Sequence, residues 1–106
     1  MTIGLAPILD DLKDRLSRLY GARLQGVYLY GSYARQEDSA ESDVDVLIVL
    51  DRVDSYCTEV TRTGELVSEL SLELGRTISC VFLPMDRWLN GETMFVLNAR
   101  KDAVPV

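Results

Sequence analysis

The sequence contains no histidine. This absence excludes zinc sites with histidine ligands, Ser-His-Asp catalysis and general bases of the histidine type. Only two cysteines are present, Cys57 and Cys80, and their spacing matches no metal-binding or redox motif. We expect both to be reduced thiols in or near the core of a cytoplasmic protein, because disulfides are rare in that compartment.

Long apolar runs and an excess of basic residues are also missing. No run approaches the roughly 18 to 20 apolar residues that a membrane-spanning helix requires. Residues 1–21 mix acids and bases with their apolar positions, so we expect neither a signal peptide nor a membrane anchor. The 11 Lys and Arg against 17 Asp and Glu give a net charge of -6, which disfavours direct binding of nucleic acid. A nucleotide substrate stays compatible with this charge, because divalent cations can bind between carboxylates and phosphates.

The 106 residues, 47% of them hydrophobic, are enough for one domain with a single core. Apolar residues recur every three or four positions over residues 5–19, which predicts an amphipathic helix. A second helix is predicted at residues 55–74 and, after a turn, a third begins near Glu92. The helical spacing of Trp88 and Phe95 favours core positions over a partner surface. The predicted apolar side of the second helix consists of Val60, Thr63, Val67, Leu70 and Leu74.

Strands are predicted at residues 25–30, 44–50, 77–83 and 104–106, where β-branched and aromatic residues gather. Residues 44–50 are apolar on both faces apart from Asp45, which is typical of a central strand covered on both sides. A helical turn at residues 32–35 and a polar loop at residues 36–42 are predicted before this strand. The order of helices and strands predicts one α/β domain over residues 1–106.

Two acids stand at the start of the predicted central strand. Because strand side chains alternate, Asp43 and Asp45 lie on the same face, with α-carbons roughly 6.5 to 7 Å apart. Carboxylates held this close repel each other, and a divalent cation removes the repulsion. Upstream, Gly31 allows close approach of the backbone to a ligand, and Ser32 offers a hydroxyl and an N–H group to a phosphate. An isolated Asp-x-Asp could equally be solubilising charge, but the preceding Gly-Ser pair favours a metal and phosphate site.

These residues resemble the signature of a known superfamily. The Gly-Ser pair, ten further residues and the Asp-Val-Asp triplet match the Gly-Ser-x10-Asp-x-Asp pattern of the polymerase-β-like nucleotidyltransferases. Residues 30–35 and 42–49 are similar to the minimal nucleotidyltransferase, or MNT, domains of prokaryotes. The resemblance implies a small α+β domain with a mixed sheet of three to four strands flanked by helices.

The resemblance also implies a site and an activity. Gly31 and Ser32 would hold the phosphates of a nucleoside triphosphate, with ATP as the expected substrate. Arg35 could reach the same triphosphate or pair with Asp43. Asp43 and Asp45 would be the catalytic residues and the ligands of Mg²⁺ or Mn²⁺. The implied reaction transfers a nucleoside monophosphate, here AMP, to a hydroxyl acceptor.

The same resemblance implies which partner this protein binds. Small proteins of this family commonly act as antitoxins beside a HEPN-domain ribonuclease toxin, which they neutralise by binding or by adenylylating a tyrosine. The implied acceptor is therefore a partner protein. Neither direct nucleic-acid binding nor membrane binding is expected, and self-association stays open.

One expected element of the site is missing. Active members usually carry a third carboxylate on the next strand, but residues 77–83 contain no acid. The third carboxylate would stand at the position of Ser79 or Val81. Asp51 is too distant to replace it, because it lies roughly 20 Å beyond Asp45 along an extended strand. Acids that could replace it only through a folded-back backbone are Glu37, Asp38, Glu41 and Asp86. Two functions stay open: a transferase with weakened or partner-dependent activity, and an antitoxin that acts by binding alone.

Overall fold

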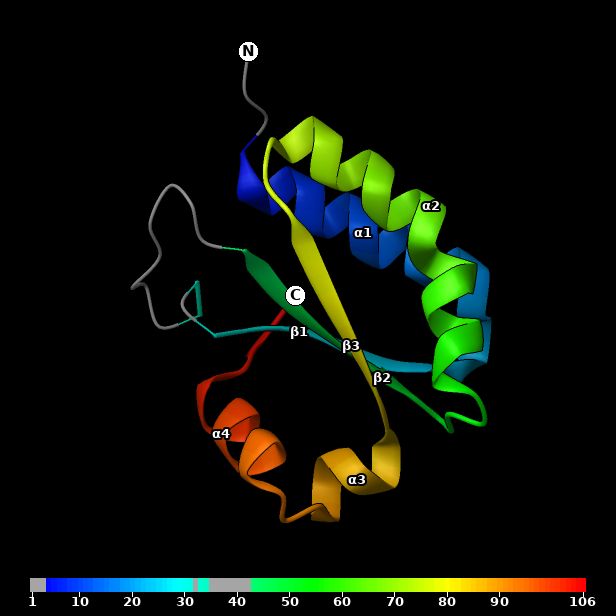
Figure 1. Ribbon diagram of the computed structural model, residues 1–106, viewed down its shortest axis with the longest axis vertical. Coiled ribbons are helices and arrows are strands. Elements are labelled where there is room, and N and C mark those ends of the chain that lie inside the picture. Colours follow the sequence, from blue (N-terminus) through cyan, green and yellow to red (C-terminus); the bar gives the residue numbers. More distant parts are fainter. Residues whose placement is uncertain (1–3, 32, 35–42) are drawn as a thin grey trace.

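The computed structural model describes residues 4–31, 33–34 and 43–106 of the chain. Its strands form one sheet, and helices cover both faces of that sheet (Figure 1). The helices are α1 (Leu5–Tyr20), α2 (Tyr56–Leu74), α3 (Met85–Asn90) and α4 (Met94–Asp102), and a 3-10 turn, η1 (Gly21–Arg23), follows α1. The strands are β1 (Leu24–Tyr30), β2 (Val44–Leu50), β3 (Ile78–Pro84) and β4 (Val104–Pro105).

The sheet is mixed and has the order β3-β2-β1-β4. β1 pairs antiparallel with β2 and β4, whereas β2 pairs parallel with β3, and α2 makes the crossover between them. β2 is therefore central, as its apolar pattern predicted, and all of its residues except Asp45 are buried. The short fourth strand also forms as predicted, beside β1.

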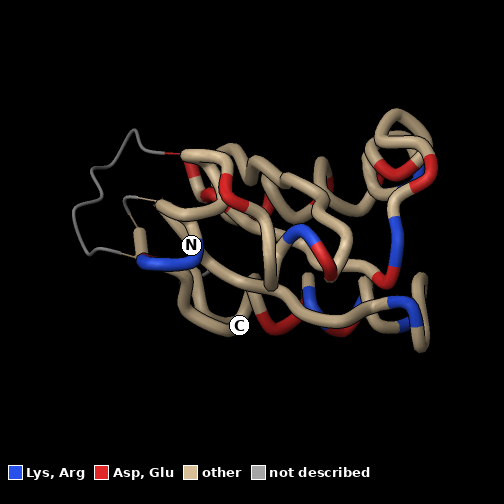
Figure 2. Tube along the Cα trace, turned by 90° about the horizontal axis from the view of Figure 1, so that it is seen from below, with Lys and Arg blue, Asp and Glu red and all other residues tan. Residues whose placement is uncertain are grey.

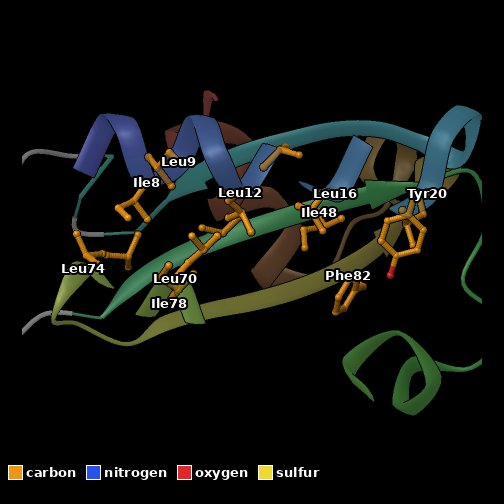
Figure 3. Close-up of a cluster of buried hydrophobic side chains, with 14 residues drawn as sticks. Ile8, Leu9, Leu12, Leu16, Tyr20, Ile48, Leu70, Leu74, Ile78 and Phe82 are labelled. Atoms are coloured by element: carbon orange, nitrogen blue, oxygen red, sulfur yellow. The ribbon is translucent and has the colours of Figure 1, made fainter. Parts of the chain in front are cut away.

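The larger core lies between the sheet and the helices α1 and α2. Alternate side chains of β2, from Val44 to Leu50, meet the apolar stripes of these helices (Figure 3). Ser55 caps α2 by accepting a hydrogen bond from the Thr58 N–H, and Gly75 ends the helix in a left-handed conformation. Fully buried helix residues in this core include Leu12, Leu16 and Leu70.

The smaller core lies on the opposite face of the sheet, under α3 and α4. Leu47 and Val49 of β2 pack there against Trp88 of α3. The rings of Trp88 and Tyr28 also contact each other, with centroids 5.0 Å apart. Trp88 is thus a core residue, as predicted, whereas Phe95 of α4 is 40% exposed.

Residues 85–91, which were expected to form a turn, contain α3 instead. A helix of six residues gains little from its own hydrogen bonds, so it depends on tertiary packing, here the burial of Trp88. β3 also continues one residue further than expected, to Pro84, which pairs with Leu50. Proline is tolerated there because β3 is an edge strand and ends at this residue.

Besides Phe95, three side chains that were expected to be buried are exposed. Cys57 was predicted in or near the core, but it lies exposed in the first turn of α2. Leu19 is 41% exposed and Val60 is 47% exposed. The neighbouring buried positions belong to polar residues, Tyr20 in α1 and Glu59 in α2, which are hydrogen-bonded to each other.

Charged residues of both signs are interspersed. Segments with Lys or Arg and segments with Asp or Glu are both spread over the described chain (Figure 2). Some form ion pairs on the helices, such as Arg15 with Asp11 of α1 and Glu69 of α2. Among the described helices, none is both long enough and apolar enough to cross a lipid bilayer.

Candidate functional site

One edge of the sheet gathers the described residues that the sequence pattern singled out. β1 runs antiparallel to β2, so the end of β1 lies beside the start of β2, and β3 starts at the same edge. Tyr30 pairs with Asp45, and Gly31 follows Tyr30 in a turn. Asp43 is exposed directly before β2, and Asp45 is half-buried within it. The two acids and Gly31 therefore come together.

Gly31 lies directly against the carboxylate of Asp45. Its φ of 75° falls in the left-handed region that favours glycine. A β-carbon built on Gly31 would lie 2.5 Å from Oδ2 of Asp45, closer than real β-carbons approach other atoms. Both the backbone and the contact therefore favour glycine, because a side chain here would strain the turn and push the Asp45 carboxylate aside.

The next strand places a hydroxyl where a third carboxylate was expected. Ser79 of β3 pairs with Asp45 in parallel register, so the two side chains lie on the same face of the sheet. Val81 pairs with Leu47, two residues further from the edge. Ser79 is thus the β3 position nearest Asp45, and it supplies a neutral group.

The other described acids that were considered do not reach this edge. Asp51 follows the far end of β2, where its Oδ1 accepts a hydrogen bond of 3.1 Å from Nε of Arg23. Asp86 follows β3 at the same far end, because β2 and β3 are parallel. Within the described residues, no group of three or more His, Cys, Asp or Glu could hold a metal ion. The residues of interest that lie outside the described ranges are Ser32, Arg35, Glu37, Asp38 and Glu41.

Two carboxylates are nevertheless a donor set that suits Mg²⁺. This ion prefers oxygen ligands and usually binds one or two protein carboxylates together with substrate phosphates and water. Asp43 and Asp45 supply such oxygens, and the exposure of Asp43 leaves access for a phosphate. The residues present therefore fit a metal ion that is bound jointly with a nucleotide.

Two groups near this edge have raised pKa values. Burial first, and then the negative charge of Asp45, raises the pKa of Tyr30 to about 12. The phenol of Tyr30 therefore stays neutral near pH 7. Burial also raises the pKa of the Cys80 thiol to about 12, which makes this cysteine a poor nucleophile.

A pocket of about 210 Å³ opens beside Gly31, between the end of β1 and α4. Its lining residues are Tyr30, Gly31, Phe95, Asn98, Ala99 and Asp102. The four residues from α4 follow a spacing of three, four and seven, which places them on one face of the helix. Asn98 and Asp102 were not predicted as site residues from the sequence, although their helical spacing from Phe95 could have indicated that they share one face with it. A larger hollow of about 660 Å³, at the end of α2, contains none of the predicted site residues.

Comparison with known proteins places this arrangement in a family. The family model described as a nucleotidyltransferase domain matches residues 9–98, which is most of the chain. The chain belongs to the nucleotidyltransferase domain family. The resemblance drawn from the Gly-Ser and Asp-x-Asp motifs is thereby confirmed.

Two curated relatives of this nucleotidyltransferase domain differ in how much of their own length the match covers. A candidate protein adenylyltransferase of Methanocaldococcus jannaschii is 35% identical over 72 residues, which are 68% of this chain and 72% of the relative. An aminoglycoside nucleotidyltransferase (4') of Staphylococcus aureus is 27% identical over 66 residues, which are 62% of this chain and 26% of the relative. The match to the aminoglycoside enzyme thus spans about a quarter of that enzyme's length.

Solved structures share the fold of this domain. A chain from a toxin-antitoxin crystal structure with AMP-PNP has a TM-score of 0.63 at 19% identity, over 91% of this chain and 70% of that one. A candidate minimal nucleotidyltransferase has a TM-score of 0.53 at 20% identity, over 92% of this chain and 95% of that one. At such identities the matches show the fold, and they confirm the predicted mixed sheet flanked by helices.

Proposed function

We propose that this domain is a metal-dependent nucleotidyltransferase that transfers AMP from ATP to a hydroxyl group of a partner protein. The observation that carries the proposal is the contact between Gly31 and the Asp45 carboxylate, at the edge where β1 ends and β2 begins. A glycine turn held against an acid on a rigid strand suits a triphosphate that is bound with its metal ion. Membership of the nucleotidyltransferase family supports the same activity.

Each residue has a role in this proposal. Gly31, Ser32 and Arg35 hold the phosphates, and Asp43 and Asp45 are the catalytic ligands of Mg²⁺ or Mn²⁺. The bound metal neutralises negative charge on the phosphates. The acceptor oxygen attacks the α-phosphorus, the bond from this phosphorus to the oxygen that bridges to the β-phosphate breaks, and pyrophosphate leaves. The proton of the acceptor hydroxyl passes to water.

The proposed acceptor is a HEPN-domain toxin with which this domain pairs as an antitoxin. Chains of similar fold come from toxin-antitoxin structures, one of them described as MntA-HpeT. The surface beside the pocket supports a protein partner, because Leu89, Met94 and Leu97 of α3 and α4 are 55%, 70% and 45% exposed. A partner on this surface would bring its hydroxyl group close to the edge that carries Asp45.

A second candidate function is neutralisation of the toxin by binding alone. The neutral Ser79 beside Asp45 favours it, because a third carboxylate at this position would complete the metal site. In that case the domain keeps its fold and its partner surface, and no nucleotide is transferred.

The test incubates the domain with labelled ATP, Mg²⁺ and the partner that co-purifies with it. We expect label on the partner, an intact mass increased by AMP, and loss of both in Asp43→Asn/Asp45→Asn. Asp86→Asn is the matched control, since Asp86 is an exposed acid at the far end of the sheet. Label that survives the double substitution would contradict the catalytic assignment. Inhibition of the partner without any label would favour binding alone.

A further inference from the structure

The outer edge of β3 has few features that would keep another chain from pairing with it. β3 is an edge strand, and no strand of the described chain pairs with its outer side. Edge strands usually carry charges, prolines or bulges that prevent such pairing. None of the seven residues of β3 is charged, its register with β2 has no break, and its one proline is the last residue. In Figure 1 no helix of the described chain passes in front of this edge.

The backbone groups of β3 show which residues face outward. The Val44 N–H of β2 donates to the Thr77 C=O at 2.9 Å, so Thr77 and every second residue after it turn toward β2. The Ile78 N–H turns the other way, because it donates to the Ser71 hydroxyl of α2 at 3.0 Å. The residues of β3 that turn their backbone groups outward are therefore Ile78, Cys80, Phe82 and, with its C=O alone, Pro84.

The two ends of β3 carry opposite charges at equal distances from its centre. Arg76 stands two residues before the strand and Asp86 two residues after it, so each is five residues from Val81. Two copies paired antiparallel about Val81 would place Arg76 of each copy near Asp86 of the other. The same register brings Cys80 opposite Phe82, so that these outward-facing residues exchange backbone hydrogen bonds. Both the charges and the hydrogen-bonding groups therefore fit a second copy of this chain.

The side of α2 next to this edge is uncharged as well. Ser71 marks this side by its hydrogen bond to β3, whereas Glu69 turns to α1 and pairs with Arg15. A hollow of about 660 Å³ opens here, and Leu72, one of its lining residues, is 83% exposed. The residues of α2 that share the side of Ser71 by their helical spacing, none of them charged, are Cys57, Val60, Gly64, Val67 and Ser68.

We propose that two copies of this chain pair antiparallel through β3, with α2 of each copy beside α2 of the other. The joined sheet has eight strands, four from each copy. Gly64 leaves room for the second helix, because a β-carbon built there meets no atom within 4 Å. The axis passes through the middle of β3, so the two edges that carry Asp45 lie at opposite ends of the joined sheet. The inference is independent of the proposed nucleotidyl transfer.

Cysteine cross-linking tests the register of this pairing. The background is the full chain with Cys57→Ser/Cys80→Ala, which removes both native thiols. Val81→Cys is added to it, because Val81 faces its own copy in a pair without hydrogen bonds. Its two α-carbons would lie about 4.5 Å apart, within the roughly 4.4–6.8 Å that a disulfide spans. We expect mild oxidation to convert most of this variant to a covalent dimer of twice the 11.9 kDa chain mass.

Leu83→Cys in the same background is the matched control. Leu83 lies on the same face of β3 as Val81, but it would be opposite Ser79 of the second copy. Two Leu83→Cys α-carbons would be more than about 13 Å apart, so this variant should stay uncross-linked. Adding Ser79→Cys to Leu83→Cys should restore the cross-link. Equal cross-linking of Val81→Cys and Leu83→Cys, or none in Val81→Cys, would overturn the proposed register.

Light scattering of the native chain tests the association without oxidation. We expect the mass to rise with concentration from one chain to two. Val60→Lys puts a charge on the uncharged side of α2 and should weaken the association about tenfold or more. Leu19→Lys is its control, because Leu19 is a similarly exposed side chain on α1. A mass of one chain at every concentration, or equal association of Val60→Lys and Leu19→Lys, would overturn the inference and leave this edge to another protein.

Discussion

A β-carbon on Gly31 would lie 2.5 Å from Oδ2 of Asp45, so any side chain in the turn after β1 would force the Asp45 carboxylate at the start of β2 to shift. Gly31→Ala would therefore displace the carboxylate of Asp45 or the turn. We expect the affinity for ATP with Mg²⁺ to fall about tenfold or more, as it does when a metal ligand loses its orientation. Calorimetric titration measures this change.

Gly75→Ala is the matched control for this substitution. Gly75 has a φ of +77°, close to that of Gly31, but no atom lies within 4 Å of its built β-carbon. Both substitutions cost about 1–2 kcal/mol of backbone strain, whereas only Gly31→Ala disturbs Asp45. Equal nucleotide affinities in the two variants would show that the contact with Asp45 has no part in binding.

Most of the fold could be predicted from local patterns, because α1 and α2 carry apolar stripes and β2 is apolar on both faces. The six residues of α3 hold too few periodic positions, and their helix depends on Trp88 meeting Tyr28 of β1. The exposure of Val60 could not be predicted either, because it accompanies the burial of Glu59 against Tyr20. Both features could not be predicted because they depend on contacts between segments that are distant in the chain.

The site could be predicted only in part. The Gly-Ser and Asp-x-Asp motifs follow each other in sequence, and β1 and β2 are also neighbours in the sheet. That Ser79 lies beside Asp45 depends on the register of β2 with β3, which neither strand specifies alone. Asn98 was missed because α4 reaches Gly31 only through the tertiary fold.

The hydrogen bond between Tyr20 and Glu59 predicts a large effect on stability. The Tyr20 hydroxyl donates to Oε1 of Glu59 at 2.8 Å in a buried position. Glu59→Ala would leave this hydroxyl without a partner and lower the free energy of unfolding by about 1–3 kcal/mol. Glu73→Ala removes an exposed acid from the same helix and should change it by less than about 0.5 kcal/mol. Urea denaturation that shows equal effects for the two variants would refute this role of Glu59.

The same pair predicts a loss of stability in alkaline solution. Burial first, and then the hydrogen bond with Glu59, raises the pKa of Tyr20 above its ordinary value of 10.0. Because the pKa is higher in the folded protein than in the unfolded chain, this contribution to stability is complete below about pH 10 and is lost as the pH rises further. Tyr20→Phe has no such group, so its melting temperature should fall less between about pH 9 and about pH 11. A parallel fall in both proteins would contradict the assignment.

The exposed apolar side chains of α4 predict where the partner binds. Met94→Ser/Leu97→Ser removes two side chains that are 70% and 45% exposed, and it should weaken binding of the partner about tenfold or more. Leu72→Ser is the control, because Leu72 is 83% exposed on α2, on the other face of the sheet. Calorimetric titration with the partner measures both. A loss of affinity in Leu72→Ser alone would move the contact surface to α2.

Ser79 predicts how the metal site responds to a third carboxylate. Ser79→Asp would place an acid beside Asp45 on the same face of the sheet. Without metal, the added charge is repelled by Asp45, so the free energy of unfolding should fall by up to about 1 kcal/mol. With Mg²⁺ the three carboxylates share the ion, and the same variant should become more stable than the native chain and bind Mg²⁺ about tenfold more tightly. The sign of the effect therefore depends on the metal.

Ser79→Asn separates this charge effect from a change in size. It has nearly the volume of Ser79→Asp but no charge, so its melting temperature should shift equally in EDTA and in Mg²⁺. Thermal unfolding of the native chain and both variants in the two buffers gives the comparison directly. If Ser79→Asp is destabilised to the same extent in EDTA and in Mg²⁺, then Asp43 and Asp45 do not hold the ion on this face. If Mg²⁺ reverses the sign only for Ser79→Asp, the register of β2 with β3 defines a metal site that lacks one ligand.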